Sequence, residues 1–456
     1  MVQFVCIRGS IRVYSRLLLR FGFGMLLFLY NLLLPLFLVV SFPVYLRRMI
    51  RRGGYARNFF QRFGFFSHRL RSDFSQGNWS WVRAVSVGEV LVAIRLIEEI
   101  RRQDPGFQAV ISTTTSTGYQ LALDRAPDWS RVIYSPVDFY PLLRPIWRVI
   151  RPKTVILIDS DLWPSFLAIA RQERTPVFLA NARLSPRSEA RYLRFQRFTK
   201  PLFWDRLSAI LSQDQHDARR WTRLGLRSDQ VVLTGSIKYD TADNPASIRF
   251  VDWLKHQGID PGRPCLLGGS LHSGEEALLL QVFRNLLPKF PDLFLILVPR
   301  HFERTPEVEK ILRELSIPYT RRSEPDFSEG RSVLIVDSTG ELNDWYQTAS
   351  LVVIGKSFTG VGGQNPVEPL LARKPVICGP HMENFKFLIE ELVREKGILQ
   401  LADEAGLSGA VEDLLSNSKA ASEMVGNSDR VLAQHRGATG RAAKFILERA
   451  GTKGDR

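Results

Sequence analysis

Short apolar segments alternate with helical segments along most of the chain, and this alternation is the strongest constraint on its fold. Strands are expected at 81–87, 109–115, 131–136, 153–159, 176–182 and 231–240, and then again at 264–270, 293–300, 332–338, 351–355 and 375–380. Continuous apolar strands joined by helical crossovers are typical of parallel sheets covered on both faces. The sequence therefore predicts an α/β protein.

The alternation stops once, at the polar stretch 241–247, and then restarts. We interpret this as two Rossmann-like domains in tandem, whose strands direct their carboxyl ends and their ligand sites toward a shared cleft. The expected organisation is an N-terminal anchor at 1–50, a first domain at 51–243, a second domain at 250–428 and a helical tail at 429–456.

The anchor is predicted from 26 uncharged residues, Phe21–Leu46. As a helix they would extend about 39 Å, enough to cross a hydrocarbon layer of about 30 Å. The run is too long for a signal peptide and no small-residue cleavage site follows it, whereas a helix of the soluble core stays open as an alternative. Arginines follow the run closely, which favours a cytoplasmic location for the rest of the chain; Arg8, Arg12, Arg16 and Arg20 precede it.

The net charge of +16 is concentrated in the first half of the chain. Residues 1–250 hold 37 Lys and Arg against 18 Asp and Glu, and residues 251–456 hold 25 against 28. Such asymmetry indicates an anionic surface as partner, either nucleic acid or lipid. The adjacent apolar run and the lack of a nucleic-acid-binding motif favour anionic phospholipid headgroups, and no nucleic acid.

The three cysteines are Cys6, Cys265 and Cys378, far apart in the sequence and without the spacing of a metal site. They indicate a reducing compartment rather than a disulfide framework.

The loop VGGQNPVEPLL, at 361–371, has two interpretations. As a helix start, Asn365 is the N-cap, Pro366 the first helical residue and Glu368 the partner of a capping box. As a ligand site, nearby glycines let the backbone approach a ligand and the helix start offers N–H groups to a phosphate. A carboxylate in the same turn suits sugar hydroxyls, so the combination fits a nucleotide with little phosphate charge.

Further polar loops follow other predicted strands. In the second domain, Arg300 can bind phosphate or carboxylate, and Gly340 and Glu341 follow the next strand. In the first domain, Glu89 opens a helix, where it either complements the helix dipole or acts as a general base. The Asp159 and Asp161 pair resembles an Asp-x-Asp metal motif, although no His or third carboxylate nearby completes a site.

Eight segments in order resemble the motifs of the 3-deoxy-D-manno-octulosonic acid (Kdo) transferases: SVGEV, LWP, NARLS, TGSIKYD, GGSLHSGEE, PRHFER, STGEL and GGQNPVEP. The resemblance covers roughly residues 20 to 400. It implies a GT-B fold with one N-terminal transmembrane helix. It also implies an inverting, metal-independent glycosyltransferase of lipid A synthesis without cofactor, which moves Kdo from CMP-Kdo to a tetraacylated lipid A precursor, lipid IVA. The implied location is the inner membrane, crossed once, with the catalytic domains on the cytoplasmic side.

By position, the resemblance assigns the catalytic base to Glu89. It assigns contacts with the CMP moiety to Pro299, Arg300, Gly340, Glu341, Leu342, Asn365, Pro366, Val367 and Glu368. The chain departs from the family pattern where Asp159, Ser160 and Asp161 replace Glu-Thr-Glu. Further departures are Gln364 for the usual His, Leu271 for Thr and Phe302 for Pro.

Two other functions remain alternatives from the sequence. One is another GT-B envelope-sugar transferase with a UDP- or ADP-linked donor, because its ribose contacts would look alike. The other is a membrane-tethered nucleotide-sugar-binding protein without catalysis.

Overall fold

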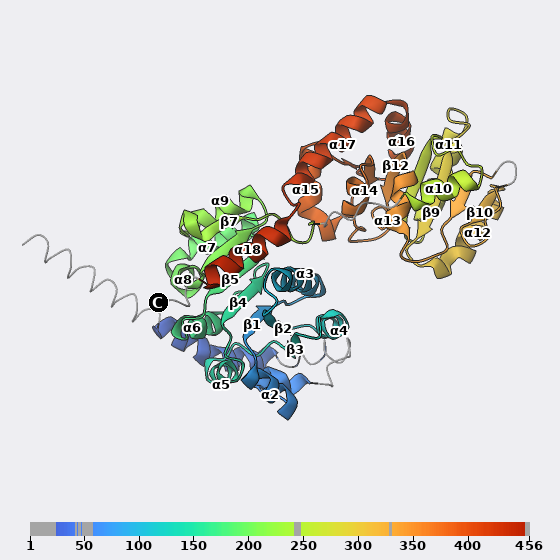
Figure 1. Cartoon of the computed structure of the whole chain (residues 1–456). Coiled ribbons are helices and arrows are strands. Elements are labelled where there is room, and N and C mark those ends of the chain that lie inside the picture. Colours follow the sequence, from blue (N-terminus) through green and yellow to red (C-terminus); the bar gives the residue numbers. More distant parts are fainter. Residues whose placement is uncertain are drawn as a thin grey trace, which may run out of the picture. The chain divides into compact units, whose positions relative to one another are not determined.

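The computed structural model describes residues 24–41, 43, 47, 58–240, 248–327 and 331–451, which form two compact units (Figure 1). Unit 1 comprises Met1–Asp240 and His435–Arg456, and unit 2 comprises Thr241–Gln434. The expected linker at 241–247, Cys6 and the four arginines before the apolar run lie outside the described residues.

Unit 1 is built on a parallel sheet, as the sequence predicts. Its strands are, in spatial order, β3 (Arg131–Tyr134), β2 (Gln108–Thr113), β1 (Trp79–Arg83), β4 (Thr154–Ile158), β5 (Val177–Ala182), β6 (Ala209–Ser212) and β7 (Val231–Leu233). Strand β1 ends at Arg83, earlier than the expected 81–87, because Ser86 already caps the following helix.

Helices cover both faces of this sheet. They are α2 (His68–Gln76), α3 (Val87–Gln103), α4 (Ser116–Arg125), α5 (Tyr140–Ile150), α6 (Pro164–Gln172), α7 (Pro186–Arg194), α8 (Gln196–Leu202), α9 (Gln215–Arg223) and α18 (Ala438–Gly451). The side chains of β1 alternate between two buried clusters: Trp81 packs with Trp147 and Phe166, and Val82 packs in the cluster that holds α3 and α18. Both faces of the strand are therefore buried, which explains why it is mostly apolar.

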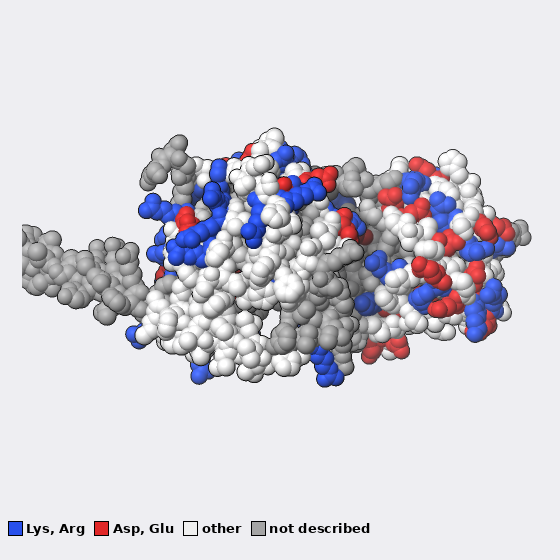
Figure 2. All heavy atoms as spheres, turned by 90° about the horizontal axis from the view of Figure 1, so that it is seen from below, with Lys and Arg blue, Asp and Glu red and all other residues white. Residues whose placement is uncertain are grey.

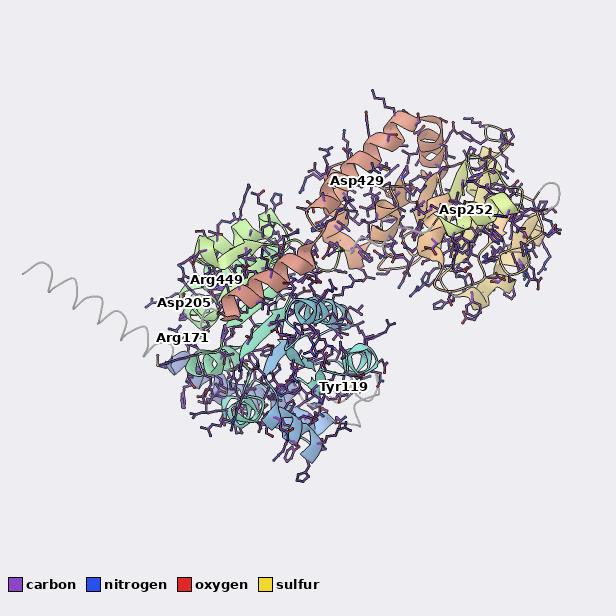
Figure 3. The ribbon with its side chains drawn as sticks, viewed as in Figure 1. Tyr119, Arg171, Asp205, Asp252, Asp429 and Arg449 are labelled. Atoms are coloured by element: carbon purple, nitrogen blue, oxygen red, sulfur yellow. The ribbon has the colours of Figure 1, made fainter. Side chains whose placement is uncertain are left out.

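The C-terminal helix α18 belongs to unit 1. Ala442, Ala443 and Ile446 join the core cluster of α3, while Arg449 lies on the exposed side over the ring of Phe445 (Figure 3). The chain thus leaves unit 1 after β7 and returns to it at His435.

Unit 2 contains a second parallel sheet. Its strands are, in spatial order, β10 (Tyr319–Arg321), β11 (Val333–Ile335), β9 (Phe294–Pro299), β8 (Cys265–Leu271), β12 (Leu351–Ile354), β13 (Val376–Cys378) and β14 (Leu399–Gln400). Its helices are α10 (Arg249–His256), α11 (Glu275–Leu286), α12 (Thr305–Glu314), α13 (Leu342–Trp345), α14 (Val367–Leu371), α15 (Lys386–Arg394), α16 (Leu407–Ser416) and α17 (Ser418–Ala433).

Each sheet has a point where the strand order reverses. In unit 1 the reversal lies between β1 and β4, and in unit 2 between β8 and β12. Ligands of open α/β sheets bind outside the carboxyl ends of the strands at such points. The loops after these four strands are therefore the expected positions of ligand sites.

One described helix, Gly24–Ser41, is long and apolar enough to cross a membrane, judged by length and composition. Its mean hydropathy is 2.1 and none of its residues is fully buried.

Candidate functional site

Glu89 lies in the first turn of α3, directly after β1. Ser86 caps this helix, and its hydroxyl accepts a hydrogen bond from the Glu89 N–H. The Glu89 carboxylate in turn accepts from the Val85 N–H at 2.7 Å and from the Ser86 hydroxyl at 3.0 Å. The sequence signature of a helix start is thus realised, and it fixes this carboxylate at the reversal point of the sheet.

The environment of Glu89 raises the pKa of its carboxyl to about 7. Burial is the main cause, and the negative charges of Asp159 and Asp161 add to it, whereas the Val85 N–H and the Ser86 hydroxyl act in the opposite direction. A carboxyl group with a pKa near 7 is suited to accept a proton from a substrate hydroxyl at neutral pH.

Asp161 forms a buried ion pair that the sequence analysis missed. Its Oδ2 accepts from Arg83 Nε at 2.8 Å, and both side chains are almost fully buried. Trp163 Nε1 donates to the other carboxylate oxygen. The only sequence signal was a single arginine at the end of an otherwise apolar strand.

Asp159 is bound to a different neighbour. Asn181 Nδ2 donates to its Oδ1 at 2.6 Å, and the Asn181 Oδ1 accepts from the Ile237 N–H at 2.9 Å. Both Asp159 and Asn181 have positive φ, 58° and 54°, which is uncommon outside glycine. Burial raises the Asp159 pKa, while the nearby Arg183 and Lys238 charges lower it. The pair therefore differs from a metal motif in that each aspartate already has a protein partner.

In unit 2, the loops after β8 and β12 are joined by Glu275, in the first turn of α11. This buried carboxylate accepts from three consecutive N–H groups, those of Lys356 at 2.6 Å, Ser357 at 3.0 Å and Phe358 at 3.1 Å. A second link is the contact between Gln364 Nε2 and His272 Nε2 at 3.1 Å. The two loops at the reversal point are therefore held in a fixed relation.

The predicted residues Asn365–Glu368 form a compact turn that differs from the expected capping box. The helix begins at Val367, after Pro366, and has only five residues. Asn365 Oδ1 accepts from the Val367 N–H at 3.1 Å, and Asn365 Nδ2 donates to Glu368 Oε1 at 3.0 Å. The expected N-cap was therefore wrong by one residue: Pro366 is the N-cap, and Asn365 precedes it and accepts from the N–H two residues later. Glu368 accepts from the Asn365 side chain instead of from a backbone N–H. One of the N–H groups expected to meet a phosphate is already used.

The glycines before this turn are explained by protein packing. Gly362 and Gly363 have φ of 110° and 67°. A Cβ at Gly363 would lie 2.3 Å from Met382 Sδ, and one at Gly362 would lie 2.7 Å from Asn384 Nδ2. Close packing against Met382 and Asn384 is thus one reason for glycine at these two positions, and it holds without a ligand.

Pro299 and Arg300 end β9, next to β8 in the sheet. Pro299 is buried, whereas Arg300 is exposed, and its backbone N–H is bound to Leu271 O at 2.9 Å. The backbone is thus anchored while the guanidinium group stays accessible to an anion.

Gly340 and Glu341 lie between β11 and α13, which begins at Leu342. Gly340 has φ of 80°, and the space where a Cβ would stand is open. Glu341 lies 3.2 Å from Arg249 Nη2 and 3.7 Å from Arg322 Nε. These two arginines were not predicted, and they place positive charge beside the predicted nucleotide-binding carboxylate.

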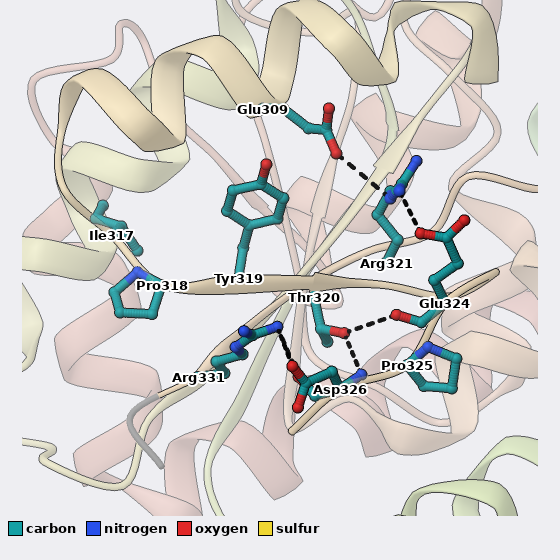
Figure 4. Close-up of a pocket in the computed structure, with 10 residues that line it drawn as sticks. All are labelled: Glu309, Ile317, Pro318, Tyr319, Thr320, Arg321, Glu324, Pro325, Asp326 and Arg331. Carbon is teal, nitrogen blue, oxygen red and sulfur yellow. Dashed lines mark hydrogen bonds and ion pairs between the residues drawn. The ribbon is translucent and has the colours of Figure 1, made fainter. Parts of the chain in front are cut away.

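A hollow of about 670 Å³ lies elsewhere in unit 2, beside β10 (Figure 4). It contains none of the predicted residues, and its charged side chains pair with one another, as Arg331 does with Asp326 at 2.8 Å. Among the residues that the structure describes, no group of three or more His, Cys, Asp or Glu side chains is arranged to hold a metal ion.

Two parallel sheets in tandem, each with polar loops at its reversal point, are the architecture of the GT-B fold. The UDP-GlcNAc 2-epimerase of Neisseria meningitidis shares this fold: the match has 14% identity and a TM-score of 0.51, and covers 82% of this chain and 100% of that structure. A C-terminal CMP-Kdo binding domain from Acinetobacter baumannii is 30% identical over 41% of this chain and 97% of its own, with a TM-score of 0.38, too low to support an argument about fold.

The sequence comparisons identify the family. Residues 57–241 match the model of the 3-deoxy-D-manno-octulosonic-acid transferases. The 3-deoxy-D-manno-octulosonic acid transferase of Haemophilus influenzae is 33% identical over 395 residues, which cover 86% of this chain and 91% of that protein. The chain belongs to the Kdo transferase family and is a glycosyltransferase that transfers Kdo in lipid A biosynthesis.

Proposed function

We propose that this enzyme transfers Kdo from CMP-Kdo to the lipid A precursor lipid IVA, with inversion at the anomeric carbon and with Glu89 as general base. The observation that carries the proposal is the position of Glu89 at the reversal point of the first sheet, with a carboxyl pKa of about 7. The family supports Kdo as the transferred sugar. It also favours this function over a UDP- or ADP-linked donor and over a binding protein without catalysis.

The proposed reaction is one displacement. Glu89 accepts the proton of a primary hydroxyl of the acceptor, and the hydroxyl oxygen bonds to the anomeric carbon of Kdo. The bond between that carbon and the CMP phosphate oxygen breaks, and its electron pair leaves with CMP. The products are the Kdo-bearing lipid, CMP and a proton, which Glu89 passes to solvent.

The second unit is proposed to hold CMP. Arg300 is exposed at the end of β9, where it would stabilise the phosphate charge that grows as CMP departs. Glu341 or Glu368 would bind ribose hydroxyls, with Gly340, Leu342 and the Asn365–Val367 turn forming the surrounding loops. CMP has a single phosphate, so the proposal requires neither a metal ion nor another cofactor.

The proposed location is the cytoplasmic face of the inner membrane, where the lipid-linked acceptor is available and phospholipid headgroups meet the basic first half of the chain. The length and hydropathy of the N-terminal run by themselves fit a single crossing, whereas the contacts of Tyr30 and Asn31 with unit 1 favour a helix docked on that unit.

The test is the substitution Glu89→Gln, with Glu98→Gln as matched control on the exposed side of the same helix. Membranes carrying each variant are incubated with CMP-Kdo and lipid IVA, and the lipid products are weighed by mass spectrometry. Loss of a general base is expected to lower turnover about 100- to 10,000-fold, with CMP binding retained. Turnover by Glu89→Gln close to that of the control would dismiss Glu89 as the base.

A further inference from the structure

The apolar helix Gly24–Ser41 is bound to unit 1 through polar side chains near its middle. Asn31 Nδ2 donates to the Ser165 hydroxyl at 3.1 Å, and Asn31 Oδ1 accepts from the Tyr140 N–H at 2.7 Å. Tyr30 donates its hydroxyl proton to Asp138 at 3.0 Å. These partners lie at or just before the starts of α5 and α6, beside which the helix runs (Figure 1).

Only the first half of this helix has a docked face. Leu26, Leu27, Tyr30, Asn31 and Leu34 are half-buried, at spacings that place them on one side of a helix. From Pro35 to Val40 every residue is exposed, and Val39 and Val40 each expose 71% of their surface. The second half is therefore an apolar segment without a protein partner among the described residues.

The docked position limits how far the rest of the run can reach. The uncharged residues after the docked face are 35–46, 12 residues. As a helix they extend about 18 Å, less than the roughly 30 Å of a hydrocarbon layer. An extended strand would reach further but would leave its backbone polar groups unsatisfied in lipid. Even if all 12 residues after the docked face were helical, they would be too short to cross.

The charges on both sides of the apolar run are a second, independent argument that it does not cross the membrane. Arg8, Arg12, Arg16 and Arg20 precede it, and Arg47, Arg48, Arg51 and Arg52 follow it. Arginine-rich flanks are retained on the cytoplasmic side of a membrane. With strongly basic segments on both sides, neither flank is favoured for export.

We propose that the N-terminal helix does not cross the membrane but is docked on unit 1 by Tyr30 and Asn31, with its free apolar surface inserted into the cytoplasmic leaflet and both basic flanks on the cytoplasmic side. Phe60 and Phe65, 65% and 67% exposed, add apolar surface to the same unit. Viewed from below, unit 1 presents a wide area without charged side chains, with Lys and Arg at its border (Figure 2). This matches a surface seated among anionic headgroups.

The docking site is connected to the candidate active site. Asp138, which accepts from Tyr30, also accepts from the N–H groups of Ser165 and Phe166 at the start of α6. That helix follows the loop in which Asp161 pairs with Arg83. The inserted helix would therefore hold the loop near Glu89 close to the lipid headgroups, where a lipid-linked acceptor arrives. The topology itself does not depend on the identity of the donor or on Glu89 as base.

The natural Cys6 tests the topology, because Cys265 and Cys378 are buried. Intact spheroplasts and inverted membrane vesicles carrying the full chain are treated with a membrane-impermeant maleimide, with Cys6→Ser as background control. We expect labelling of Cys6 in inverted vesicles only; labelling in spheroplasts would overturn the proposal. The second measurement is the digestion of an N-terminal epitope tag by protease added to the same two preparations. Digestion in spheroplasts contradicts the proposal, and digestion confined to inverted vesicles supports it.

Docking is tested by crosslinking in a Cys6→Ser chain. Oxidation of membranes should join Asn31→Cys to Ser165→Cys, whose native side chains are in contact. The matched control is Leu32→Cys with Ser165→Cys, because Leu32 is 60% exposed on the opposite side. An equal yield for the two pairs, or none for the first, would refute the docked helix.

Insertion is tested with a fluorophore on Val39→Cys in vesicles of phosphatidylethanolamine and phosphatidylglycerol. Both variants are made in a Cys6→Ser chain. Bromine atoms on the acyl chains should quench the fluorophore at position 39 at least twofold more than they quench one on Ser75→Cys, an exposed residue of α2. Equal quenching at the two positions would show that the helix does not enter lipid.

Discussion

The carboxyl group of Glu89 has an observed structural role and a proposed catalytic role, which the sequence alone left as alternatives. It completes the start of α3 by accepting from the Val85 N–H, and the same geometry holds it where burial raises its pKa to about 7. The start of α3 thus holds the Glu89 carboxylate in a buried position, and burial favours its protonated form.

This environment predicts the pH dependence of the enzyme. A general base works in its deprotonated form, so kcat/KM should fall about tenfold per pH unit below a limiting pKa of about 7 and level off above it. The measurement is initial Kdo transfer at constant ionic strength from pH 5.5 to 9. A rate that stays constant down to pH 5.5 would be inconsistent with the raised pKa.

The Arg83–Asp161 pair predicts a non-additive effect on stability. Arg83→Met should lower the free energy of unfolding by about 3–5 kcal/mol, because Asp161 is left charged and buried. Adding Asp161→Asn should recover a large part of that loss. Urea denaturation of the two single variants and the double variant measures the coupling, with Arg223→Met, an exposed ion-pair residue, as control. Strict additivity would contradict a direct pair.

At the residue scale, the sequence was informative where a motif had local geometry. Glu89 follows Ser86 by three residues, a spacing that itself describes a helix start. Arg83 and Asn181 gave no such signal, because their partners Asp161 and Asp159 lie far away in the sequence, in the loop after β4. Their importance arises only once β1, β4 and β5 lie side by side.

At the element scale, most strands could be predicted, and β6, β10 and β14 were missed. Length alone does not explain the misses, because β7, β11 and β13 have three residues each and were predicted. β10 and β14 lie at the two edges of the second sheet, and their sequences, YTR and LQ, lack the apolar run that identifies the inner strands. Pairing with a neighbouring strand is what defines these two edge strands.

The loop after β12 gives the prediction at this scale. Glu275→Gln should lower the free energy of unfolding of unit 2 by about 1–3 kcal/mol, because a neutral amide cannot accept equally well from three N–H groups. It should also loosen the loop that leads to Asn365. Hydrogen exchange at residues 356–358 reports the effect, and Glu314→Gln, exposed at the end of α12, is the matched control. Unchanged protection at 356–358 would count against the clamp.

At the scale of the whole molecule, the sequence predicts a helical tail at 429–456 but does not indicate where that tail packs. The structure places α18 on α3, with Ala442 and Ala443 fully buried. Small residues at these positions allow the two helices to approach closely. The return of the chain to unit 1 follows from this packing, which no local sequence pattern specifies.

Removal of α18 should therefore damage the unit that contains Glu89. A chain ended after Gly437 would expose the face of α3 against which α18 packs, at a cost of several kcal/mol. We expect Ala443→Asp to act in the same direction, whereas Lys444→Asp on the exposed side should be tolerated. Limited proteolysis within residues 58–240 measures the effect. Equal resistance of the truncated and full chains would show that α18 is dispensable.

The position of α18 has a consequence for synthesis on the ribosome. The nascent first unit must wait until about 200 further residues have been translated before its last helix emerges, and during that interval the face of α3 is uncovered. Premature termination anywhere in unit 2 would leave this apolar surface exposed. Chaperones and proteases could then recognise incomplete chains, whereas α18 covers the same surface in complete chains.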